Sequence, residues 1–417
     1  MIGIAWKSLL NRWPTALLAV LAIAMSVTLI LTVEKVRRDA RSSFTQTVSG
    51  TDLIIGARSG SVQLLLYSVF RIGNATNNIS WESVEDIKKR KAIDWVVPLS
   101  LGDSHAGFRV LGTSLDYFKH YTYSNRTALQ LSEGVLFDDV FDAVLGSEVA
   151  AELGYGINDS IVVAHGTGKV ALVEHDRQPF RVSGILKPTG TPVDRAIHIS
   201  LEGIEAMHVD WQNGANKKGA GTDADTVRNM DLSPSAVTAL LVGLKSRATV
   251  FREQRAINTY RAEPLLAILP GVALQELWSL VSVAEMALMI VSVCVVVAGL
   301  INLLSVLLAG LNERRREMAV LRSAGARPGH VFLLLCIESA VLTIFGIIAG
   351  LVLHYLFIGV GALFLQQRFG LAISLSLPSA TDLKILITIA IAGLLAGSLP
   401  ALQAYRNSLA DGLSQRL

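Results

Sequence analysis

Five arginines gather in one short segment of this sequence, residues 312–330, which lies between two long apolar runs. The segment reads NERRREMAVLRSAGARPGH, and two glutamates, Glu313 and Glu317, stand among the arginines Arg314, Arg315, Arg316, Arg322 and Arg327. Guanidinium groups bind phosphates and carboxylates through paired, charge-assisted hydrogen bonds. The cluster could therefore contact anionic lipid headgroups or a partner protein.

Two histidines outside this segment have types and spacing that fit a metal site. His165 and His175 end the two strands of a predicted hairpin. Imidazole is a common ligand of zinc and other borderline metals. The alternative is that both side chains face solvent in loops, and the sequence leaves both interpretations open.

Three further polar residues fall inside apolar runs: Glu285, Asn302 and Glu338. Polar groups within a membrane span are candidates for function. A structural role is equally consistent with their positions, because Glu285 and Glu338 lie near the ends of their runs and could pair with a neighbouring arginine. The stretch HGTGKVA (165–171) lacks the spacing and the Ser or Thr of a phosphate-binding loop, so no enzyme active site is predicted.

The composition identifies the elements that must position these residues. Of the 417 residues, 51% are hydrophobic and 17% are charged, and the mean hydropathy is +0.48. Such values are typical of a membrane protein. Four apolar runs can cross a hydrocarbon core of about 30 Å as helices: 13–33, 279–311, 331–365 and 383–402.

Residues 34–278, between the first two runs, contain short strands rich in Val and Ile that alternate with short helices. Helices are expected at 61–70, at 80–91 with Ser80 as the N-cap, and at 146–154. The predicted fold class is therefore membrane α-helical, with four transmembrane helices and a large α+β extracytoplasmic domain inserted between helices 1 and 2. The first two spans are expected to extend towards this domain as helical stalks.

The remaining segments are short. Residues 1–12 are predicted to form an amphipathic helix on the cytoplasmic surface, 366–382 a short outer loop, and 403–417 a cytoplasmic tail. Lysines and arginines in short flanking segments favour a cytoplasmic location for both termini and for 312–330. A basic group directly after the first span argues the other way: Lys35, Arg37, Arg38 and Arg41.

Two pairs of small residues occur in the last two spans, in GIIAG (346–350) and GLLAG (393–397). Such pairs allow helices to approach closely. They predict tight packing, either within one chain or between two copies.

The segment 312–330 also has a helical pattern. Strong helix formers run up to Gly325, which can cap the helix, and Ala319, Val320 and Leu321 form an apolar patch. A short helix with arginines and an apolar patch is suited to contact with a partner protein.

This segment and its continuation, NERRREMAVLRSAGARPGHVFLLLCIESAVLTIFGIIAG, resemble the signature of the MacB/FtsX/LolC family of ABC transporter permeases (type VII-like). In that family a motif of the form R-R-x-E-[IM]-x-x-L-R-x-x-G-A makes the coupling helix between the second and third spans. The end GLLAGSLPALQAYRNSLADGL is similar to the family's C-terminal pattern, and AVLGSEVAAELG with FRVSGILKPTG resembles its outer domain. The stretch TDLIIGARSGSVQLLLYSVFRIGNATNNIS is most similar to a YtrF-like subgroup.

The resemblance implies a membrane permease subunit that is not an enzyme and holds no cofactor. ATP and magnesium would be bound by a separate ABC ATPase subunit, present in two copies. The residues implied to contact this ATPase are Glu313, Arg314, Arg315, Arg316, Glu317, Leu321, Arg322, Gly325 and Arg327.

The resemblance also implies a second permease copy as a homodimer, contact with membrane lipid and with a periplasmic or lipoprotein partner, and no nucleic acid. The location would be the bacterial inner (cytoplasmic) membrane, with the large domain periplasmic or extracellular. Movements of that domain would export or extract a lipoprotein, lipid, peptide or drug-like substrate. The alternatives are an FtsX-like regulator that activates an outer partner without transport, and a metal-linked (zinc) transport system.

Overall fold

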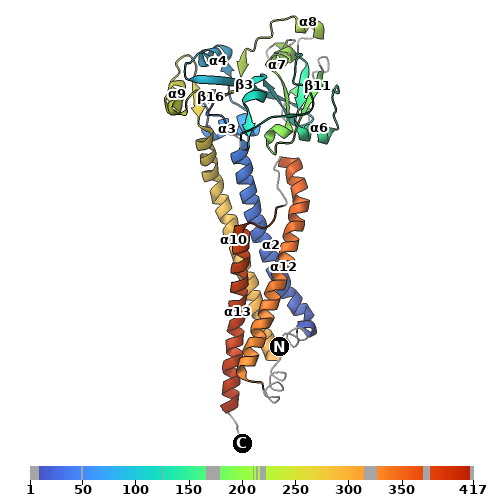
Figure 1. The fold of residues 1–417 in the computed structure, drawn as a ribbon, viewed down its shortest axis with the longest axis vertical. Helices are drawn as coiled ribbons and strands as arrows, with labels where there is room; N and C mark the ends of the chain where they lie inside the picture. The colour runs from blue at the N-terminus through green and yellow to red at the C-terminus, as the bar shows by residue number, and fades with distance from the viewer. Residues whose placement is uncertain are drawn as a thin grey trace. The chain divides into compact units, whose positions relative to one another are not determined.

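The structure is a computed structural model that describes residues 9–47, 50–124, 126–165, 179–209, 211–212, 215–216, 222–313, 326–369 and 376–413. The chain forms two compact units (Figure 1). The helical unit comprises Met1–Ala40, Ser282–Gln367 and Ile373–Leu417, and the α+β unit comprises Arg41–Val281 and Arg368–Ala372.

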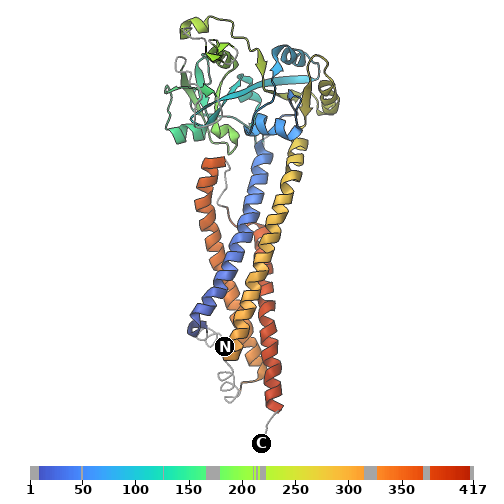
Figure 2. The same ribbon diagram turned by 180° about the vertical axis from the view of Figure 1, so that it is seen from behind.

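Four long helices make up the described part of the helical unit, and they lie alongside one another in both views (Figures 1 and 2). They are α2 (Trp13–Thr47), α10 (Pro270–Glu313), α12 (Pro328–Phe369) and α13 (Ala380–Leu413). Each contains a stretch that is long and apolar enough to cross a membrane. The α+β unit is inserted between the first and second of these helices, so the predicted fold class is confirmed.

Helices α2 and α10 both extend beyond the helical unit. Residues 41–47 of α2 and 270–281 of α10 belong to the α+β unit. At 1.5 Å per residue the 44 residues of α10 span about 66 Å, roughly twice the thickness of a hydrocarbon core. Each of these two helices thus continues without a break from one unit into the other.

A mixed sheet is the centre of the α+β unit. Its strands, in spatial order, are β17 (Leu265–Ile268), β1 (Leu53–Ala57), β16 (Ala239–Leu244), β3 (Ile93–His105), β4 (Phe108–Thr113), β12 (Ala196–Ser200), β8 (Asp142–Leu145), β11 (Phe180–Leu186) and β7 (Leu131–Gly134). In addition β10 (Ala164–His165) pairs with β3, and β9 (Ser160–Ile161) pairs with β11. The pairs β12–β4 and β11–β8 are parallel.

Three two-stranded pairs accompany this sheet: β13 (Trp211–Gln212) with β14 (Ala215–Asn216), β15 (Ala236–Val237) with β2 (Ile79–Ser80), and β5 (Thr122–Tyr123) with β6 (Thr127–Ala128). The helices of the unit are α3 (Ser61–Phe70), α4 (Trp81–Lys88), α5 (Asp116–His120), α6 (Ser147–Leu153), α7 (Leu201–His208), α8 (Ala224–Arg228) and α9 (Val250–Asn258), with short 3-10 turns η1 (Pro192–Arg195) and η2 (Arg247–Thr249).

Alternation along the strands assigns side chains to the two faces of the sheet. In β1, Ile54 packs in one apolar cluster with α3 and α5, whereas Leu53 and Ile55 pack in another with α4 and α9. Side chains point to alternate faces of a strand, so a strand buried on both faces is a continuous apolar run. A third cluster joins β8, β11 and β12 to α6 and α7.

The predicted helices at 61–70, 80–91 and 146–154 correspond to α3, α4 and α6. Ser80 is the N-cap of α4, because its hydroxyl accepts a hydrogen bond from the Ser83 amide at 3.4 Å. Strand β8 and helix α7 were not predicted. The second strand of the predicted histidine hairpin lies outside the described residues.

Candidate functional site

Helices of the helical unit approach closely at the small-residue pairs. A Cβ added at Gly346 of α12 would come within 2.6 Å of Ile23, and one at Gly350 within 2.7 Å of Val27 and of the Ala24 carbonyl oxygen, all on α2. Added Cβ atoms at Gly393 and Gly397 of α13 would overlap Thr343 and Ser339 of α12. The predicted tight packing is therefore present, and both contacts are within one chain.

Hydroxyl groups strengthen the same contacts. Ser26 of α2 donates to the Val295 carbonyl of α10 at 3.0 Å, and Thr28 donates to the Gly350 carbonyl of α12 at 3.0 Å. Ser339 of α12 donates to the Gly393 carbonyl of α13 at 2.8 Å. Such bonds between membrane helices are typically worth about 0.6 kcal/mol each.

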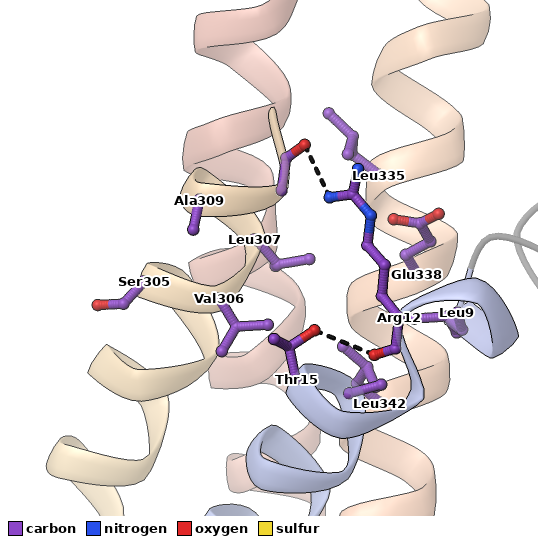
Figure 3. Close-up of a pocket in the computed structure, with 12 residues that line it drawn as sticks. Leu9, Arg12, Thr15, Ser305, Val306, Leu307, Ala309, Leu335, Glu338 and Leu342 are labelled. Carbon is purple, nitrogen blue, oxygen red and sulfur yellow. Dashed lines mark hydrogen bonds between the residues drawn. The ribbon is translucent and has the colours of Figure 1, made fainter. Parts of the chain in front are cut away.

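A cavity of about 240 Å³ lies between the first turn of α2, the last turns of α10 and the first turns of α12 (Figure 3). Arg12 enters it just before α2 and donates to the Gly310 carbonyl oxygen of α10 at 3.1 Å. The buried Glu338 of α12 lines the same cavity, with Thr15, Ser305 and apolar side chains. Gly310 is three residues before Glu313, so the cavity is next to the point where the chain enters the arginine-rich segment.

The three polar residues predicted within the spans do not form one site. Glu338 is 1% exposed and lines the cavity. Glu285 is partly exposed and lies close enough to Arg37 of α2 for electrostatic attraction. Asn302 follows Glu285 by 17 residues of α10, about 25 Å along the helix.

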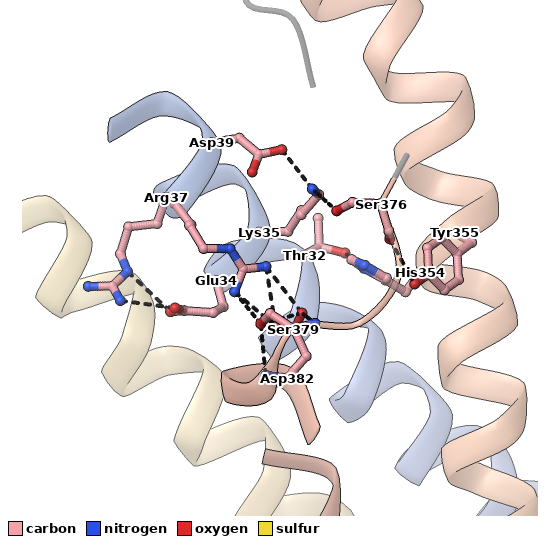
Figure 4. A network of polar contacts seen from close by, with 11 residues as sticks. Thr32, Glu34, Lys35, Arg37, Asp39, His354, Tyr355, Ser376, Ser379 and Asp382 are labelled. Carbon is pink, nitrogen blue, oxygen red and sulfur yellow. Dashed lines mark hydrogen bonds and ion pairs between the residues drawn. The ribbon is translucent and has the colours of Figure 1, made fainter. Parts of the chain in front are cut away.

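A polar network connects the C-terminal part of α2 to α12 and to the start of α13 (Figure 4). We call it the Arg38 clasp; its members are Thr32, Lys35, Arg38, His354, Tyr355, Ser376, Ser379 and Asp382. The Arg38 guanidinium pairs with the Asp382 carboxylate at 3.1 Å and donates to the Ser379 hydroxyl at 2.6 Å.

Two more bonds complete the clasp on the same face of α2. The Lys35 ammonium donates to the Ser376 hydroxyl at 2.8 Å, and Thr32 Oγ1 lies 2.9 Å from His354 Nδ1. Ser376 is also held by α12, because the Tyr355 hydroxyl donates to its carbonyl oxygen at 3.1 Å. The clasp therefore joins α2 to two elements that lie more than 300 residues further along the chain.

Ser379 and Asp382 form a reciprocal cap at the start of α13. The Ser379 amide donates to the Asp382 carboxylate at 2.8 Å, and the Asp382 amide donates to the Ser379 hydroxyl at 3.2 Å. This S-x-x-D pattern before an apolar run is a sequence signal for a helix start. It could have identified part of the clasp.

Two of the four cations that follow the first span, Lys35 and Arg38, belong to the clasp, and the other two have partners elsewhere. Lys35 pairs with Asp39 at 2.9 Å, Arg37 with Glu34 at 3.0 Å and Arg38 with Asp382. Arg41, in the α+β unit, lies over the Trp278 ring. These cations have structural partners within the protein.

Most of the predicted ATPase-contact residues, Arg314 to Gly325, lie outside the described residues. Glu313 is the last residue of α10. Arg327 is exposed and precedes α12, and its amide donates to His330 Nδ1 at 3.0 Å. Their role stays a prediction.

The structure leaves the metal prediction open. His175 and the side chain of His165 lie outside the described part of the chain. Within the described part, no three His, Cys, Asp or Glu side chains group as metal ligands would.

The α+β unit has a cavity of about 460 Å³ at the carboxyl ends of the parallel strands β4 and β12, where Thr113 and Ser200 end the strands. Ligands often bind at such strand ends. Its acidic lining has a structural explanation: Asp116 and Glu202 lie in the first turns of α5 and α7, where negative charge stabilises a helix, and Asp139 pairs with Arg228 at 2.9 Å.

A buried histidine lies in the core of the same unit. His198 of β12 is fully buried and packs against Tyr117, and its Nδ1 lies 3.2 Å from the Val144 carbonyl oxygen. Burial, together with the positive charge of Arg71, lowers the pKa of His198 to about 3. The imidazole is therefore neutral near pH 7.

Comparisons with known proteins cover most of the chain. The family model described as MacB-like periplasmic core domain matches residues 16–259, and the one described as FtsX-like permease C-terminal matches residues 289–409. No curated protein matches the sequence.

Two solved structures are similar to parts of the chain. The periplasmic region of MacB from Actinobacillus actinomycetemcomitans has 15% identity and a TM-score of 0.33, and the match covers 55% of this chain and 94% of that one. The extracellular domain of the noncanonic ABC-type transporter YknZ from Gram-positive bacteria has 13% identity and a TM-score of 0.30, over 52% of this chain and 99% of that one.

The first family model alone matches more than half of the 417 residues, and the second matches most of the remaining spans. The insertion of an α+β unit between the first and second long helices agrees with this pair of matches. The chain belongs to the MacB/FtsX family of ABC transporter permeases.

Proposed function

We propose that this chain couples ATP hydrolysis by a separate ATPase subunit to movements of its α+β unit, which acts outside the cytoplasm on a lipoprotein, lipid, peptide or drug-like substrate. The observation that carries the proposal is the continuity of α10. One helix runs from Pro270, in the α+β unit, to Glu313, where the predicted ATPase-docking segment begins. A displacement at one end of a continuous helix is carried to the other end.

The ATPase subunits would supply the energy by hydrolysing ATP. The chain is proposed to be a non-catalytic permease subunit, with ATP and magnesium bound by two copies of an ABC ATPase. The docking surface would be the helix between Glu313 and Arg327, in which the arginines pair with acidic groups of the ATPase and Leu321 enters an apolar pocket. Family membership supports this, because members work with ABC ATPases.

The orientation follows from the short segments. Both termini and residues 312–330 would be cytoplasmic and the α+β unit periplasmic or extracellular, because lysines and arginines concentrate in the segments assigned to the inside. The membrane would be the bacterial inner membrane. Assignment to a YtrF-like subgroup stays a prediction.

A second copy is proposed to complete the transporter. Many apolar side chains of α10 are exposed on the single chain, among them Val283, Met286, Ile290 and Ile301. Part of this surface faces lipid, and part would contact the second copy in a homodimer of eight spans. A periplasmic or lipoprotein partner would meet the α+β unit.

An FtsX-like regulatory role is the alternative. The same movement would then activate an outer partner, and no substrate would be moved. A zinc-linked system is a further alternative that depends on His165 and His175. Zinc titration of the purified chain, with and without His165→Ala and His175→Ala, tests it, and absence of binding excludes it.

The central test is capture of the co-encoded ATPase by the tagged permease in detergent. Arg314→Glu combined with Leu321→Asp is expected to abolish capture, because the change reverses one charge and removes an apolar anchor. Arg416→Glu with Leu417→Asp makes matched changes in the C-terminal tail and should leave capture intact. If the first variant still captured the ATPase, the docking assignment would be wrong.

Topology is tested separately in intact cells. Added protease should cut within residues 60–250 and spare 312–330, because only the former would be outside. The reverse pattern would overturn the orientation.

A further inference from the structure

The Arg38 clasp has a regular geometry on α2. Thr32, Lys35 and Arg38 follow one another at intervals of three residues, which places them on one face of the helix. That face meets α12 at His354 and the start of α13 at Ser379 and Asp382. Glu34 and Arg37, on another face, point towards α10 (Figure 4).

Two of the three ion-pairing groups of the clasp are buried, and the third, the Arg38 side chain, is 33% exposed. Lys35 is 6% exposed and Asp382 is 8% exposed. Removing charges from water costs several kcal/mol per ion, and a buried pair often contributes no more stability than apolar residues of the same size. What a buried, hydrogen-bonded pair does supply is a defined position for the two elements that it joins.

The rest of α2 is held differently. Towards its N-terminus α2 contacts α12 at Gly346 and Gly350, where the close approach depends on the absence of side chains. Packing of that kind resists approach but does little against sliding, and the hydrogen bond from Thr28 to the Gly350 carbonyl holds this contact in one direction. The Arg38 guanidinium, by contrast, contacts both Asp382 carboxylate oxygens and the Ser379 hydroxyl. Contacts in several directions resist displacement in each of them.

The clasp also lies near the point where α2 leaves the helical unit, which suits it to passing on a movement of the spans. Arg38 is two residues before the helical unit ends at Ala40, and α2 continues as residues 41–47 of the α+β unit. Asp382 is the third residue of α13, and its cap fixes the start of that helix. The clasp therefore links the last turn of α2 in the helical unit to the α12–α13 pair.

We propose that Arg38 and Lys35 are positioning residues for the coupling movement. They fasten the C-terminal part of α2 to α12 and α13, so that a displacement of these two helices is carried into α2 and then into residues 41–47. The inference rests on the proposed function, because it assigns a route to the movement assumed there. Helix α2 would then transmit the displacement to the α+β unit alongside α10.

The test measures the movement directly. Cysteines replace Phe251 and Ile391, which are 71% and 55% exposed, in a chain whose two native cysteines are changed to alanine. Spin labels on these residues report the distance between the α+β unit and α13 in lipid nanodiscs with the ATPase. The shift between the nucleotide-free and vanadate-trapped states is the readout.

Three variants separate transmission from folding. Arg38→Gln with Asp382→Asn removes the ion pair without leaving a lone buried charge, so this neutral pair should fold, and it is expected to lose the shift. Arg38→Asp with Asp382→Arg restores an ion pair of opposite polarity and should regain part of the shift. Arg37→Gln with Glu34→Gln, on another face of α2, neutralises a second ion pair in the same way; it is the matched control and should keep the full shift.

Retention of the full shift by the neutral pair would overturn the proposal, as would loss of the shift in Arg37→Gln with Glu34→Gln. Capture of the ATPase is measured for every variant. If the unaltered chain fails to capture the ATPase, the proposed function fails and the inference fails with it. If capture and shift are normal in the unaltered chain and in the neutral pair, only the role of the clasp is refuted.

Discussion

The contact between α2 and α12 predicts a large difference between two glycine substitutions on the same helix. In Gly350→Ala the new methyl group would lie 2.7 Å from the Ala24 carbonyl oxygen and from Val27 Cβ. Both neighbours belong to the framework of α2, since one is backbone and the other is the first atom of a β-branched side chain. The two helices must therefore move apart.

The magnitude follows from three contributions. Overpacking of this kind costs about 1–3 kcal/mol. Separation of the helices also weakens the 3.0 Å bond from Thr28 to the Gly350 carbonyl, which is worth about 0.6 kcal/mol. Alanine gains about 1 kcal/mol over glycine in helix propensity. Together these give an expected net loss for Gly350→Ala of about 0.6–2.6 kcal/mol.

Gly359→Ala is the matched control. It lies on α12 as well, and an added Cβ there would meet nothing within 4 Å. Only the propensity gain applies, so this variant should be neutral or more stable by up to about 1 kcal/mol. The propensity gain cancels between the two alanine variants, so they should differ by about 1.6–3.6 kcal/mol.

The assay is reversible unfolding of the purified chain in mixed micelles with increasing SDS, followed by helix content. The midpoint should fall for Gly350→Ala and stay or rise for Gly359→Ala. Val27→Ala in the Gly350→Ala background keeps Val27 Cβ but removes Cγ1, which would lie 2.9 Å from the added methyl group, so it should restore a small part of the loss. Equal midpoints for the two single variants would mean that α2 and α12 do not approach as described.

Three further predictions concern the α+β unit and the start of α13. Because the pKa of His198 is lowered to about 3 from an ordinary value of 6.5, the unfolded chain binds more protons below pH 6.5, and stability should fall by about 1.4 kcal/mol per pH unit from there down towards pH 3. His198→Phe should flatten this acid dependence in urea unfolding at pH 7.5 and pH 5, and an unchanged slope would contradict the assignment. The urea midpoint of unfolding should be clearly lower for Gly134→Ala than for Gly154→Ala. Both glycines have positive φ, but only at Gly134 would the new Cβ overlap a backbone oxygen, that of Ser183. Equal midpoints would refute this. Ser379→Ala should lower the SDS midpoint by an amount equivalent to about 0.5–2 kcal/mol, because α13 loses its cap; no change would show that the cap contributes nothing.

The sequence predicted the elements that are specified by residues close together in the chain. Four apolar runs specified the four long helices, and the Ser80 hydroxyl specified the start of α4. Strand β8 was missed because its four residues, Asp142–Leu145, show too little alternation to stand out. Helix α7 was missed although Ser200 caps it, because Gly203 interrupts the helical pattern.

The Arg38 clasp could not be predicted in the same way. Its ionic contact joins residues 344 positions apart, and no local pattern in the sequence indicates that Arg38 and Asp382 are in contact. From the sequence, Lys35, Arg37 and Arg38 stood out as charges that complicate the orientation. In the structure they form ion pairs with Asp39, Glu34 and Asp382, which composition alone does not indicate.

The contacts of α2 argue that this helix, rather than α10 alone, connects the spans to the α+β unit. Arg12 and Ser26 bond to carbonyls of α10, Thr28 bonds to a carbonyl of α12, and Arg38 pairs with Asp382 of α13. Helix α2 thus has a polar contact with each of the other three long helices before it enters the α+β unit. In the proposed coupling, a movement that begins at the arginine-rich segment reaches α2 through Gly310 of α10, or through α12 and the clasp. The neutral clasp variant tests the second of these routes, because it removes the ion pair between α2 and α13 and leaves the bonds to α10 in place.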